Sequence, residues 1–572
     1  MAMMPTLLSL AALAATAIAA PLPATYLRTE YLVDPALVDP AAPPRFSWVL
    51  PTEPAERGVA QSAYALIVTL GNATVWSSGR VASAQQNQVV YGGPPLTPDS
   101  TYAWSVQWWD AAGAAAPPSA PASFGTAPGA DADWDAAGAQ WIGCTGVGAN
   151  SNQLRLDFAA KGPAGGAPLS AARLYISGLG WHRPFLNGAR LSRSVFEPAF
   201  THLRLRVLYS AHDVTHLLDA RGGNNTLAVL LGQGWPAQFE PWEGNVFGEP
   251  VWNGTGSQRA RGVRDPREAR ANPAPLGHGK SGYERRLRAW LSLTWADGSK
   301  SSVVTSAGAL GGGAGGGAGW MCGSGAFLAD DIYAGVAYDA RRETPGWTAP
   351  GFNFSLGAWG PAVRLAAPGG AMAPAVSQPV EVTNELPPCD LWEGAPGVWM
   401  FDFCQNFAGV VRLALPGPTA PGTVLTIRHA EAVMHPPYGP KDGSLYFGNL
   451  RSAEATDVYI TRGDPAGEVF EPVWTWHGFR YISVEGLDFT PTLTGGLVTG
   501  VHFRSNAPLT GALAFPDSAN TMNQLQHAIV WTQASNILGN PSECVARAPP
   551  PPPPFPFLSH PHSCRPPHNP TL

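Results

Sequence analysis

Five acidic and histidine residues in the C-terminal third of the chain have side chains suited to proton transfer. They are Asp402, His429, Glu431, Asp457 and His477. Carboxylates and imidazoles act as general acids and bases, so these residues could form a carboxylate–histidine site. Each lies on or beside an apolar, strand-like run, however, where polar side chains usually fix the fold through hydrogen bonds. The sequence therefore favours a structural network, and no H-x-H or H-E-x-x-H spacing in this stretch predicts a metal site.

A second group of side chains is suited to binding sugars. Indole rings present flat apolar faces that stack on the C–H faces of pyranose rings, and the chain contains 21 tryptophans. Trp181, Asn187 and Trp235 fall at predicted turns or strand ends, where a stacking ring and a hydrogen-bonding amide could meet one sugar. The alternative for each is a packing role in the fold.

The elements that must position these side chains are short β-strands. Only 13% of the residues are charged, and 65 glycines and 58 prolines divide the 572 residues into short segments. These segments are rich in Val, Thr, Tyr and Trp, which is typical of β-sandwiches, and the length suggests roughly 3–5 domains. We therefore expect a mainly β protein built from tandem sandwiches.

Strand and turn signals divide the chain into three units. We expect a fibronectin III-like sandwich over residues 25–127, a second sandwich over 138–330 and a third over 340–505. Within the second unit, Asn187-Gly188 is the strongest hairpin signal in the chain. Residues 253–282 combine low hydrophobicity with many helix and strand breakers, which predicts a disordered insertion.

The β pattern ends before a predicted helix. The spacing of Met522, Leu525 and Ile529 places their apolar side chains on one helical face within Asp517–Leu538. We find no second helical segment after it with which this face could pack.

Several features predict a secreted protein. Met1–Ala20 has an apolar stretch followed by an Ala-x-Ala site, so residues 1–19 are expected to be a signal peptide. The six widely spaced cysteines permit disulfides but leave their pairing open. The net charge of −6 argues against a nucleic-acid partner, and we expect no membrane span. N-glycosylation sequons occur at Asn72, Asn224, Asn253 and Asn353.

The motifs of all three units together resemble the bacterial-type α-L-rhamnosidases, glycoside hydrolase family 78. In the first unit the resemblance rests on LRTEYLVDP, PPRFSWVL, QSAYALIV and TYAWSVQWWD. In the second it rests on LYISGLGWHRPFLNGARL, VLYSAHDVTHLL and LAVLLGQGW. In the third it rests on DIYAGVAYDAR, FDFCQNFAGVVRL, RHAE, NLRSAEATDVY and WHGFRY. Two residues depart from the family pattern: Cys404 replaces a glycine, and Val336 replaces a residue that is usually acidic.

This resemblance implies a carbohydrate-binding-like second sandwich and a concanavalin-like third sandwich that packs against a catalytic (α/α)6 barrel. Family members hydrolyse terminal, non-reducing α-L-rhamnose with inversion, using a general acid and a general base. Residues 517–547 are similar to the start of that six-hairpin barrel, whereas 548–572 form an unrelated Pro-rich tail. The expected catalytic carboxylates would lie beyond Arg547 and are absent, because Glu543 is the single acidic residue after Asp517. We therefore expect an orphan barrel helix and no catalysis by this chain.

Three interpretations follow from the resemblance. The chain is an α-L-rhamnosidase by descent that lacks its catalytic domain, a secreted carbohydrate-binding protein without catalysis, or the product of a truncated gene. The implied partners are rhamnose-containing glycosides or polysaccharides. No cofactor is expected; some relatives bind rhamnose through calcium, but no calcium ligand can be assigned in this sequence. The oligomeric state is left open.

Overall fold

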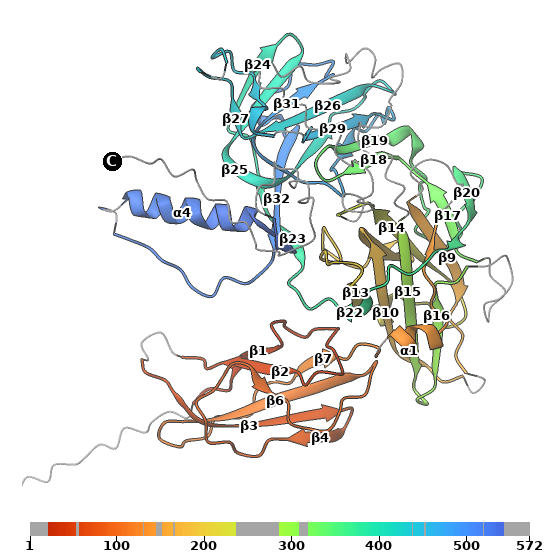
Figure 1. The fold of residues 1–572 in the computed structure, drawn as a ribbon, viewed down its shortest axis with the longest axis vertical. Helices are drawn as coiled ribbons and strands as arrows, with labels where there is room; N and C mark the ends of the chain where they lie inside the picture. The colour runs from red at the N-terminus through yellow and green to blue at the C-terminus, as the bar shows by residue number, and fades with distance from the viewer. Residues whose placement is uncertain are drawn as a thin grey trace, which may run out of the picture.

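The computed structural model describes residues 21–542, apart from residues 53–56, 130, 145–151, 164–165, 236–284, 308–318, 438, 451–452, 517 and 519. The described residues are mainly β-strands, accompanied by helices α1 (Asp131–Ala136) and α4 (Asn520–Ser535). The predicted fold class is confirmed. The strands gather into three bodies, stacked from the red N-terminal body to the blue C-terminal one (Figure 1). The predicted signal peptide 1–19, insertion 253–282 and tail 548–572 lie outside the described residues.

The first sandwich, residues 25–127, packs two small sheets around an aromatic core. Along its longest strands, apolar side chains alternate with polar ones, so Tyr102, Trp104, Val106 and Trp108 all face inward and are buried. One sheet contains β1 (Thr25–Thr29), β2 (Arg45–Val49) and β5 (Val89–Val90). The other contains β4 (Ala73–Ser77), β3 (Gln61–Leu70), β6 (Thr101–Asp110) and β7 (Ala122–Gly125).

The second sandwich also has two sheets. One follows the order β21-β8-β15-β10-β13-β22 with β16 beside β15, and the other follows β12-β11-β14-β9-β17-β20. The predicted hairpin is confirmed, because Asn187 and Gly188 join β11 to β12 with φ angles of 52° and 86°. The bounds are β8 (Ile142–Gly143), β9 (Gln153–Ala159), β10 (Leu169–Leu179), β11 (Trp181–Leu186), β12 (Ala189–Arg190), β13 (Arg206–Asp213), β14 (Asn224–Gly232), β15 (Arg286–Trp295), β16 (Lys300–Val304), β17 (Met321–Ser324), β20 (Ala358–Pro361), β21 (Val363–Arg364) and β22 (Ala371–Pro374).

The third sandwich is built on one sheet of ten strands. Its main path is β18-β19-β29-β26-β31-β25-β32-β23, and β24 and β30 both pair with β25. The register of β25 shifts between Asp402 and Phe407. This irregularity allows the long strand to pair with several other strands. The bounds are β18 (Phe327–Asp331), β19 (Gly335–Asp339), β23 (Val380–Leu386), β24 (Asp390–Ala395), β25 (Val398–Leu415), β26 (Val424–Ala430), β29 (Thr456–Ile460), β30 (Glu468–Phe470), β31 (His477–Glu485) and β32 (Val498–Ser505).

The predicted boundary between the second and third units, at residues 330–340, is wrong. Strands β18 and β19 belong to the third sandwich, since β19 pairs in parallel with β29. The chain then returns to the second sandwich, where β20, β21 and β22 pair with β17, β8 and β13. It finally re-enters the third sandwich at β23. The pairings of β19 with β29, β21 with β8 and β22 with β13 join segments more than a hundred residues apart, and local strand signals carry no information about them.

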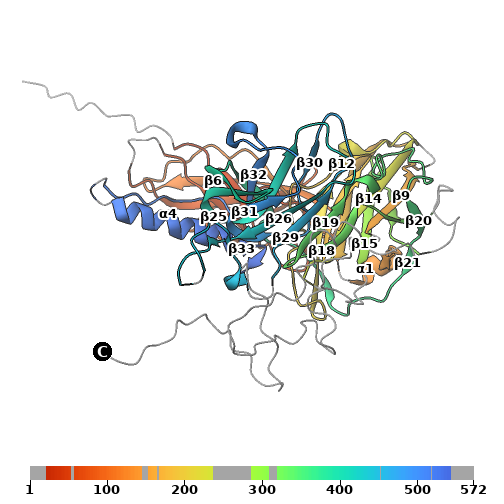
Figure 2. The ribbon, with the colours of Figure 1, turned by 90° about the horizontal axis from the view of Figure 1, so that it is seen from above.

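Asp99 links the first sandwich to the second. Its carboxylate accepts hydrogen bonds from the Tyr175 hydroxyl at 2.7 Å and the Ser292 hydroxyl at 2.7 Å. The Lys300 ammonium donates to the same carboxylate at 2.6 Å. Seen from above, the first sandwich lies beneath the third (Figure 2). A polar contact of this kind fixes the orientation of two domains because each of its hydrogen bonds is directional.

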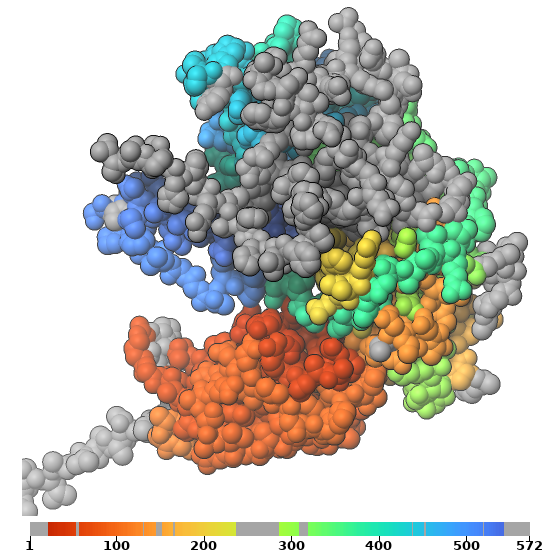
Figure 3. All heavy atoms as spheres, viewed as in Figure 1, coloured from red at the N-terminus to blue at the C-terminus, as the bar shows by residue number. Residues whose placement is uncertain are grey.

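Helix α4 confirms the predicted helix, with slightly narrower bounds than Asp517–Leu538. It lies at the periphery beside the third sandwich, where the space-filling view shows it in blue (Figure 3). Trp531 packs against His502 of β32 at a ring distance of 5.0 Å. The other large apolar side chains of α4 are exposed: Met522, Leu525, Ile529 and Val530. No helix among the described residues is long and apolar enough to cross a membrane.

Two disulfides are formed among the described cysteines. Cys144 bonds to Cys322 in the second sandwich, and Cys389 bonds to Cys404 in the third. Cys404 has a φ angle of 57°, a conformation that favours glycine, which accounts for the glycine at this position in the family pattern. The disulfide anchors this unfavourable residue to the strand beside it.

Removing the Cys389–Cys404 disulfide is expected to destabilise the third sandwich. The bond closes a loop with a sequence separation of 15, and a loop of that size corresponds to about 3 kcal/mol of unfolding free energy. The double serine variant should therefore unfold at lower temperature, as measured by circular dichroism without reductant. Equal melting temperatures for both proteins would contradict the prediction.

Candidate functional site

Three of the five predicted acid–base residues meet inside the third sandwich. His429 on β26, Asp457 on β29 and His477 on β31 come from three adjacent strands, and all are at most 2% exposed. Asp457 Oδ2 lies 3.2 Å from His477 Nε2 and 3.8 Å from His429 Nε2. The other oxygen, Oδ1, accepts the Val336 N–H at 2.9 Å. Because substrate cannot reach enclosed side chains, the favoured structural network is confirmed for this triad.

The electrostatics of the triad follow from burial. Burial, and after it the neighbouring His477, lower the pKa of His429 to about 3. For Asp457 burial raises the pKa, but the charge and hydrogen bond of His477 outweigh it and leave the pKa below its usual value. The triad thus holds an ionised carboxylate against a neutral His429 ring.

The two remaining acid–base candidates lie elsewhere, so the single five-residue site drawn from the sequence is wrong. Asp402 forms a two-pronged ion pair with Arg480, with both contacts at 2.8 Å. Glu431 accepts hydrogen bonds from the amides of Asn406 at 3.0 Å and Asn449 at 2.7 Å. Both carboxylates are therefore engaged in contacts that hold the chain around the register shift of β25.

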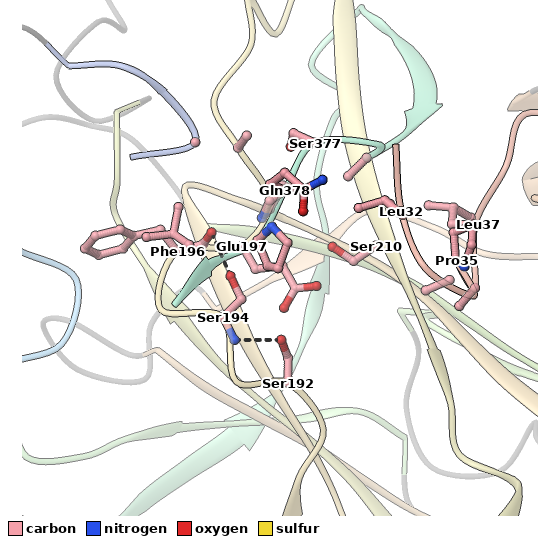
Figure 4. Close-up of a pocket in the computed structure, with 18 residues that line it drawn as sticks. Leu32, Pro35, Leu37, Ser192, Ser194, Phe196, Glu197, Ser210, Ser377 and Gln378 are labelled. Carbon is pink, nitrogen blue, oxygen red and sulfur yellow. Dashed lines mark hydrogen bonds between the residues drawn. The ribbon is translucent and has the colours of Figure 1, made fainter. Parts of the chain in front are cut away.

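A pocket with a mixed polar and apolar lining lies where the three sandwiches meet (Figure 4). It is lined by residues 32–37 of the first sandwich, by 192–199 and 210–211 of the second, and by the linker 375–380 with Gly539. The space open to the centres of water-sized molecules is about 160 Å³. Glu197, Ser210 and Gln378 approach one another from different segments in the close-up.

Behind this pocket, Glu197 forms a cluster with two histidines. His212 Nε2 lies 3.4 Å from Glu197 Oε1. His182 Nδ1 accepts the Gly178 N–H at 2.9 Å, so the hydrogen of this neutral ring resides on Nε2. Burial raises the pKa of Glu197, but the charge and hydrogen bond of His212 outweigh it and hold the pKa well below its usual value. The cluster therefore keeps a charged carboxylate at the domain junction.

Among the residues that the structure describes, three groups of side chains bring possible metal-ligand atoms within 4.8 Å of one another. They are His182/Glu197/His212, Cys389/Asp402/Cys404 and His429/Asp457/His477. The cysteine group is closed to metals by its disulfide. Calcium requires several oxygen ligands, and each group offers a single carboxylate, so none matches a calcium site. The two histidine groups have the nitrogen and oxygen ligands that zinc prefers.

His182 predicts a loss of stability in mild acid. Burial lowers its pKa to about 4, against about 6.5 in an unfolded chain. Between these values the unfolded state binds more protons than the folded state, so stability falls as pH falls from 6.5 to 4. The loss amounts to about 2–3 kcal/mol for this group. A His182→Gln variant should show a flatter dependence in urea unfolding across this range; an identical slope would contradict the assignment.

The three residues predicted to bind sugar differ in burial and in their neighbours. Trp181 is 2% exposed and packs in the junction with the third sandwich, against Phe196 at 4.5 Å and Trp474 at 6.1 Å. Its ring is enclosed, which agrees with a packing role in the fold, the alternative to sugar binding. Trp235 is half-buried and lies 5.7 Å from Trp476. Sugar binding at these residues stays a prediction.

Asn187 occupies the hairpin turn and is held by its own hydrogen bonds. Its side-chain amide donates to Leu217 O and Asn225 Oδ1, both at 2.8 Å, and its oxygen accepts the Thr226 N–H at 2.8 Å. These contacts use the amide to fix the turn against β14. Of the four predicted glycosylation sites, Asn72, Asn224 and Asn353 are exposed, and Asn253 lies outside the described residues.

Three family models match consecutive parts of the chain. The N-terminal immunoglobulin domain of Rha78A-like proteins matches residues 24–129. The α-L-rhamnosidase N-terminal domain matches residues 167–251 and 275–384. The concanavalin-like domain of bacterial α-L-rhamnosidases matches residues 393–502. The order of these models agrees with the order of the three sandwiches.

Curated relatives carry the same family name. An α-L-rhamnosidase of Streptomyces avermitilis is 35% identical over 410 residues, which cover 71% of this chain and 33% of the relative. An α-L-rhamnosidase of Formosa agariphila is 28% identical over 522 residues, covering 88% of this chain and 49% of the relative. The chain therefore spans about a third to a half of the length of these proteins.

Solved structures of two relatives share the fold. The α-L-rhamnosidase of Dictyoglumus thermophilum superposes with a TM-score of 0.72 at 27% identity, covering 92% of this chain and 53% of that structure. The S. avermitilis enzyme, crystallised with L-rhamnose, gives a TM-score of 0.71 at 25% identity, covering 92% of this chain and 61% of that structure.

Sequence reasoning missed the Glu197 cluster. Its members His182, Glu197 and His212 lie on separate strands or loops, and no spacing among them is typical of a site. One local signal was available, since Glu197 precedes Pro198 in an otherwise apolar run and an isolated carboxylate there requires a partner.

Proposed function

This chain belongs to the bacterial-type α-L-rhamnosidases, and from that premise we propose that its protein hydrolyses terminal, non-reducing α-L-rhamnose from glycosides or polysaccharides with inversion. The observation that supports this proposal is the match of three rhamnosidase domain models, in order, between residues 24 and 502. Inversion requires a general acid and a general base about 6.5–9.5 Å apart.

Within this function, we assign supporting roles to the described sandwiches. The acid–base candidates they contain are enclosed or held by ion pairs and amide hydrogen bonds, as for the His429 triad, Asp402 and Glu431. Groups held in this way stabilise the fold rather than exchange protons with a substrate. The third sandwich also carries α4, whose exposed apolar side chains are available for contact with further protein.

The test is an assay on an aryl α-L-rhamnoside, with the released anomer identified by NMR. The protein purified from its own organism is expected to release rhamnose as the inverted anomer. Turnover of other aryl glycosides without turnover of the rhamnoside would overturn the proposal. The 572-residue chain assayed beside it locates the catalytic groups, because turnover by this chain would place them within its own residues.

A second candidate function is carbohydrate binding without hydrolysis. It is favoured by the crystallisation of the S. avermitilis relative with L-rhamnose and by the half-buried Trp235 at the edge of the second sandwich. Calorimetry with L-rhamnose, with and without calcium, separates this function from hydrolysis. Heat of binding without turnover supports it, and no heat under either condition rejects it.

We also propose that the protein is secreted. Disulfides persist in oxidising compartments, and the pairs Cys144–Cys322 and Cys389–Cys404 support such a location. The exposed sequons at Asn72, Asn224 and Asn353 agree with it. Recovery of the protein from the culture medium, with a mass that falls on deglycosylation, is the expected result; retention inside the cell without glycans would reject the proposal.

A further inference from the structure

One oxygen of the Glu197 carboxylate has no partner at the junction of the three sandwiches. Glu197 Oε1 faces His212 Nε2 at 3.4 Å, whereas Oε2 is buried and accepts no hydrogen bond from the described residues. The hydroxyl of Ser210, a residue that is 6% exposed, is also buried without a hydrogen bond. Leaving such groups unpaired costs free energy, and the cost is largest for a charged group. The two oxygens therefore indicate a bound molecule that donates hydrogen bonds to them.

Both groups line the junction pocket, and a third polar side chain joins them there. Glu197, Ser210 and Gln378 point toward one another in the close-up (Figure 4). The Gln378 amide nitrogen donates to the carbonyl oxygen of Tyr31 at 3.1 Å, which fixes this side chain and leaves its oxygen for a ligand. The three residues come from separate segments, so a molecule held among them would contact the second sandwich and the linker 375–380 together.

The wall that the first sandwich supplies to this pocket is apolar. Leu32, Pro35 and Leu37 line it and lie together on one side of the polar groups (Figure 4). Among the described residues that line the pocket, Glu197 is the single charged one. An apolar wall with a few convergent polar groups is typical of a small-molecule site. A ligand that fits must present hydrogen-bond donors along one edge and carbon along another.

The size and charge of the pocket separate the classes of ligand. Its space of about 160 Å³ for the centres of water-sized molecules is roughly ten times what one water molecule needs, so a lone metal ion would leave most of it unfilled. Glu197 would repel an anion, and an apolar molecule would leave the carboxylate unpaired. Because His212 already lies beside this charge, neutral donors suffice. Ser377 and Pro379, which are exposed, also line the pocket, so a ligand can enter from solvent.

We propose that the junction pocket binds one neutral monosaccharide, a 6-deoxyhexose, whose hydroxyls donate to Glu197 Oε2 and the Gln378 oxygen while its methyl group faces Leu32 and Leu37. A pyranose ring carries hydroxyls along its edge and C–H groups on its faces, which matches the two kinds of wall. The choice of sugar rests on the proposed function, since rhamnose is the 6-deoxyhexose that the protein would release. The pocket itself requires no hydrolysis, and it is separate from Trp235, which does not line it.

The test is calorimetric titration of the full chain with L-rhamnose, for which saturable binding is expected. Glu197→Gln should weaken this binding about tenfold or more, because it removes the charged acceptor, and Ser210→Ala should weaken it by about two- to tenfold. Glu393→Gln is the matched control. Glu393 is an exposed carboxylate of β24 that does not line the pocket, and its variant should bind the sugar as the unmodified protein does.

A measurement on the unmodified protein covers the case in which the variants fail to fold. Crystals grown with saturating L-rhamnose should show the sugar between Glu197 and Leu32. Ordered water alone in the pocket would overturn the proposal, as would unchanged affinity in Glu197→Gln together with lost affinity in Trp235→Ala. Rhamnoside hydrolysis, measured in parallel, keeps the two proposals apart: hydrolysis without sugar in the pocket rejects the pocket alone, and sugar in the pocket without hydrolysis rejects the proposed function alone.

Discussion

Replacing Asp457 with alanine is expected to lower the free energy of unfolding of the third sandwich by about 3–5 kcal/mol. The substitution removes the acceptor of the Val336 N–H and of His477 Nε2, both inside the core. Two buried donors would then have no partner, and two histidines would lose the carboxylate between them. Urea unfolding followed by tryptophan fluorescence measures the change.

Asp488→Ala is the control for this experiment, since Asp488 lies on the surface of the same sandwich just after β31. Surface substitutions of this kind change stability by about 0.5 kcal/mol or less. Equal effects from the two alanine variants would show that the triad does not stabilise the fold.

Trp181→Ala is the second substitution with a large expected effect, a loss of about 3–5 kcal/mol. The indole fills the junction between the second and third sandwiches, where it contacts Phe196, Trp474 and Trp476. Its removal leaves a cavity bounded by rings from both bodies. Differential scanning calorimetry should record a lower transition temperature, and limited proteolysis should cut the linker 375–380 faster.

Trp181→Phe separates loss of packing from loss of the indole N–H. Phenylalanine retains most of the buried ring area, so this variant should recover more than half of the lost stability. If Trp181→Ala unfolds like the unmodified protein, the junction is held by other contacts. If it retains stability but loses affinity for L-rhamnose, the predicted sugar-binding role of Trp181 gains support.

Local patterns predicted the elements of this fold well where neighbouring residues decide the conformation. Asn187-Gly188 predicts its turn, because the conformation of a hairpin turn depends on a few adjacent residues. The helix was predicted within three residues at each end. The boundary near residue 330 could not be predicted, because β19 pairs with β29, which follows it by more than a hundred residues along the chain.

The candidate site was predictable in its residue types but not in its grouping. His429, Asp457 and His477 meet because three strands pair in one register, and the sequence separates them by 20 and 28 residues. Asp402 and Glu431 are equally suited to proton transfer by their chemistry. Asp402 instead pairs with Arg480, and Glu431 accepts hydrogen bonds from two asparagine amides. Burial, which decides between proton transfer and structural support, depends on the complete fold.

The path of the chain between the second and third sandwiches limits how the protein can be divided. A fragment starting at residue 340 would lack β18 and β19, leaving the paired edge of β29 open to other strands. A fragment ending at residue 330 would lack β20, β21 and β22, which complete both sheets of the second sandwich. Neither body can therefore be produced whole from one contiguous segment of the chain that omits the other.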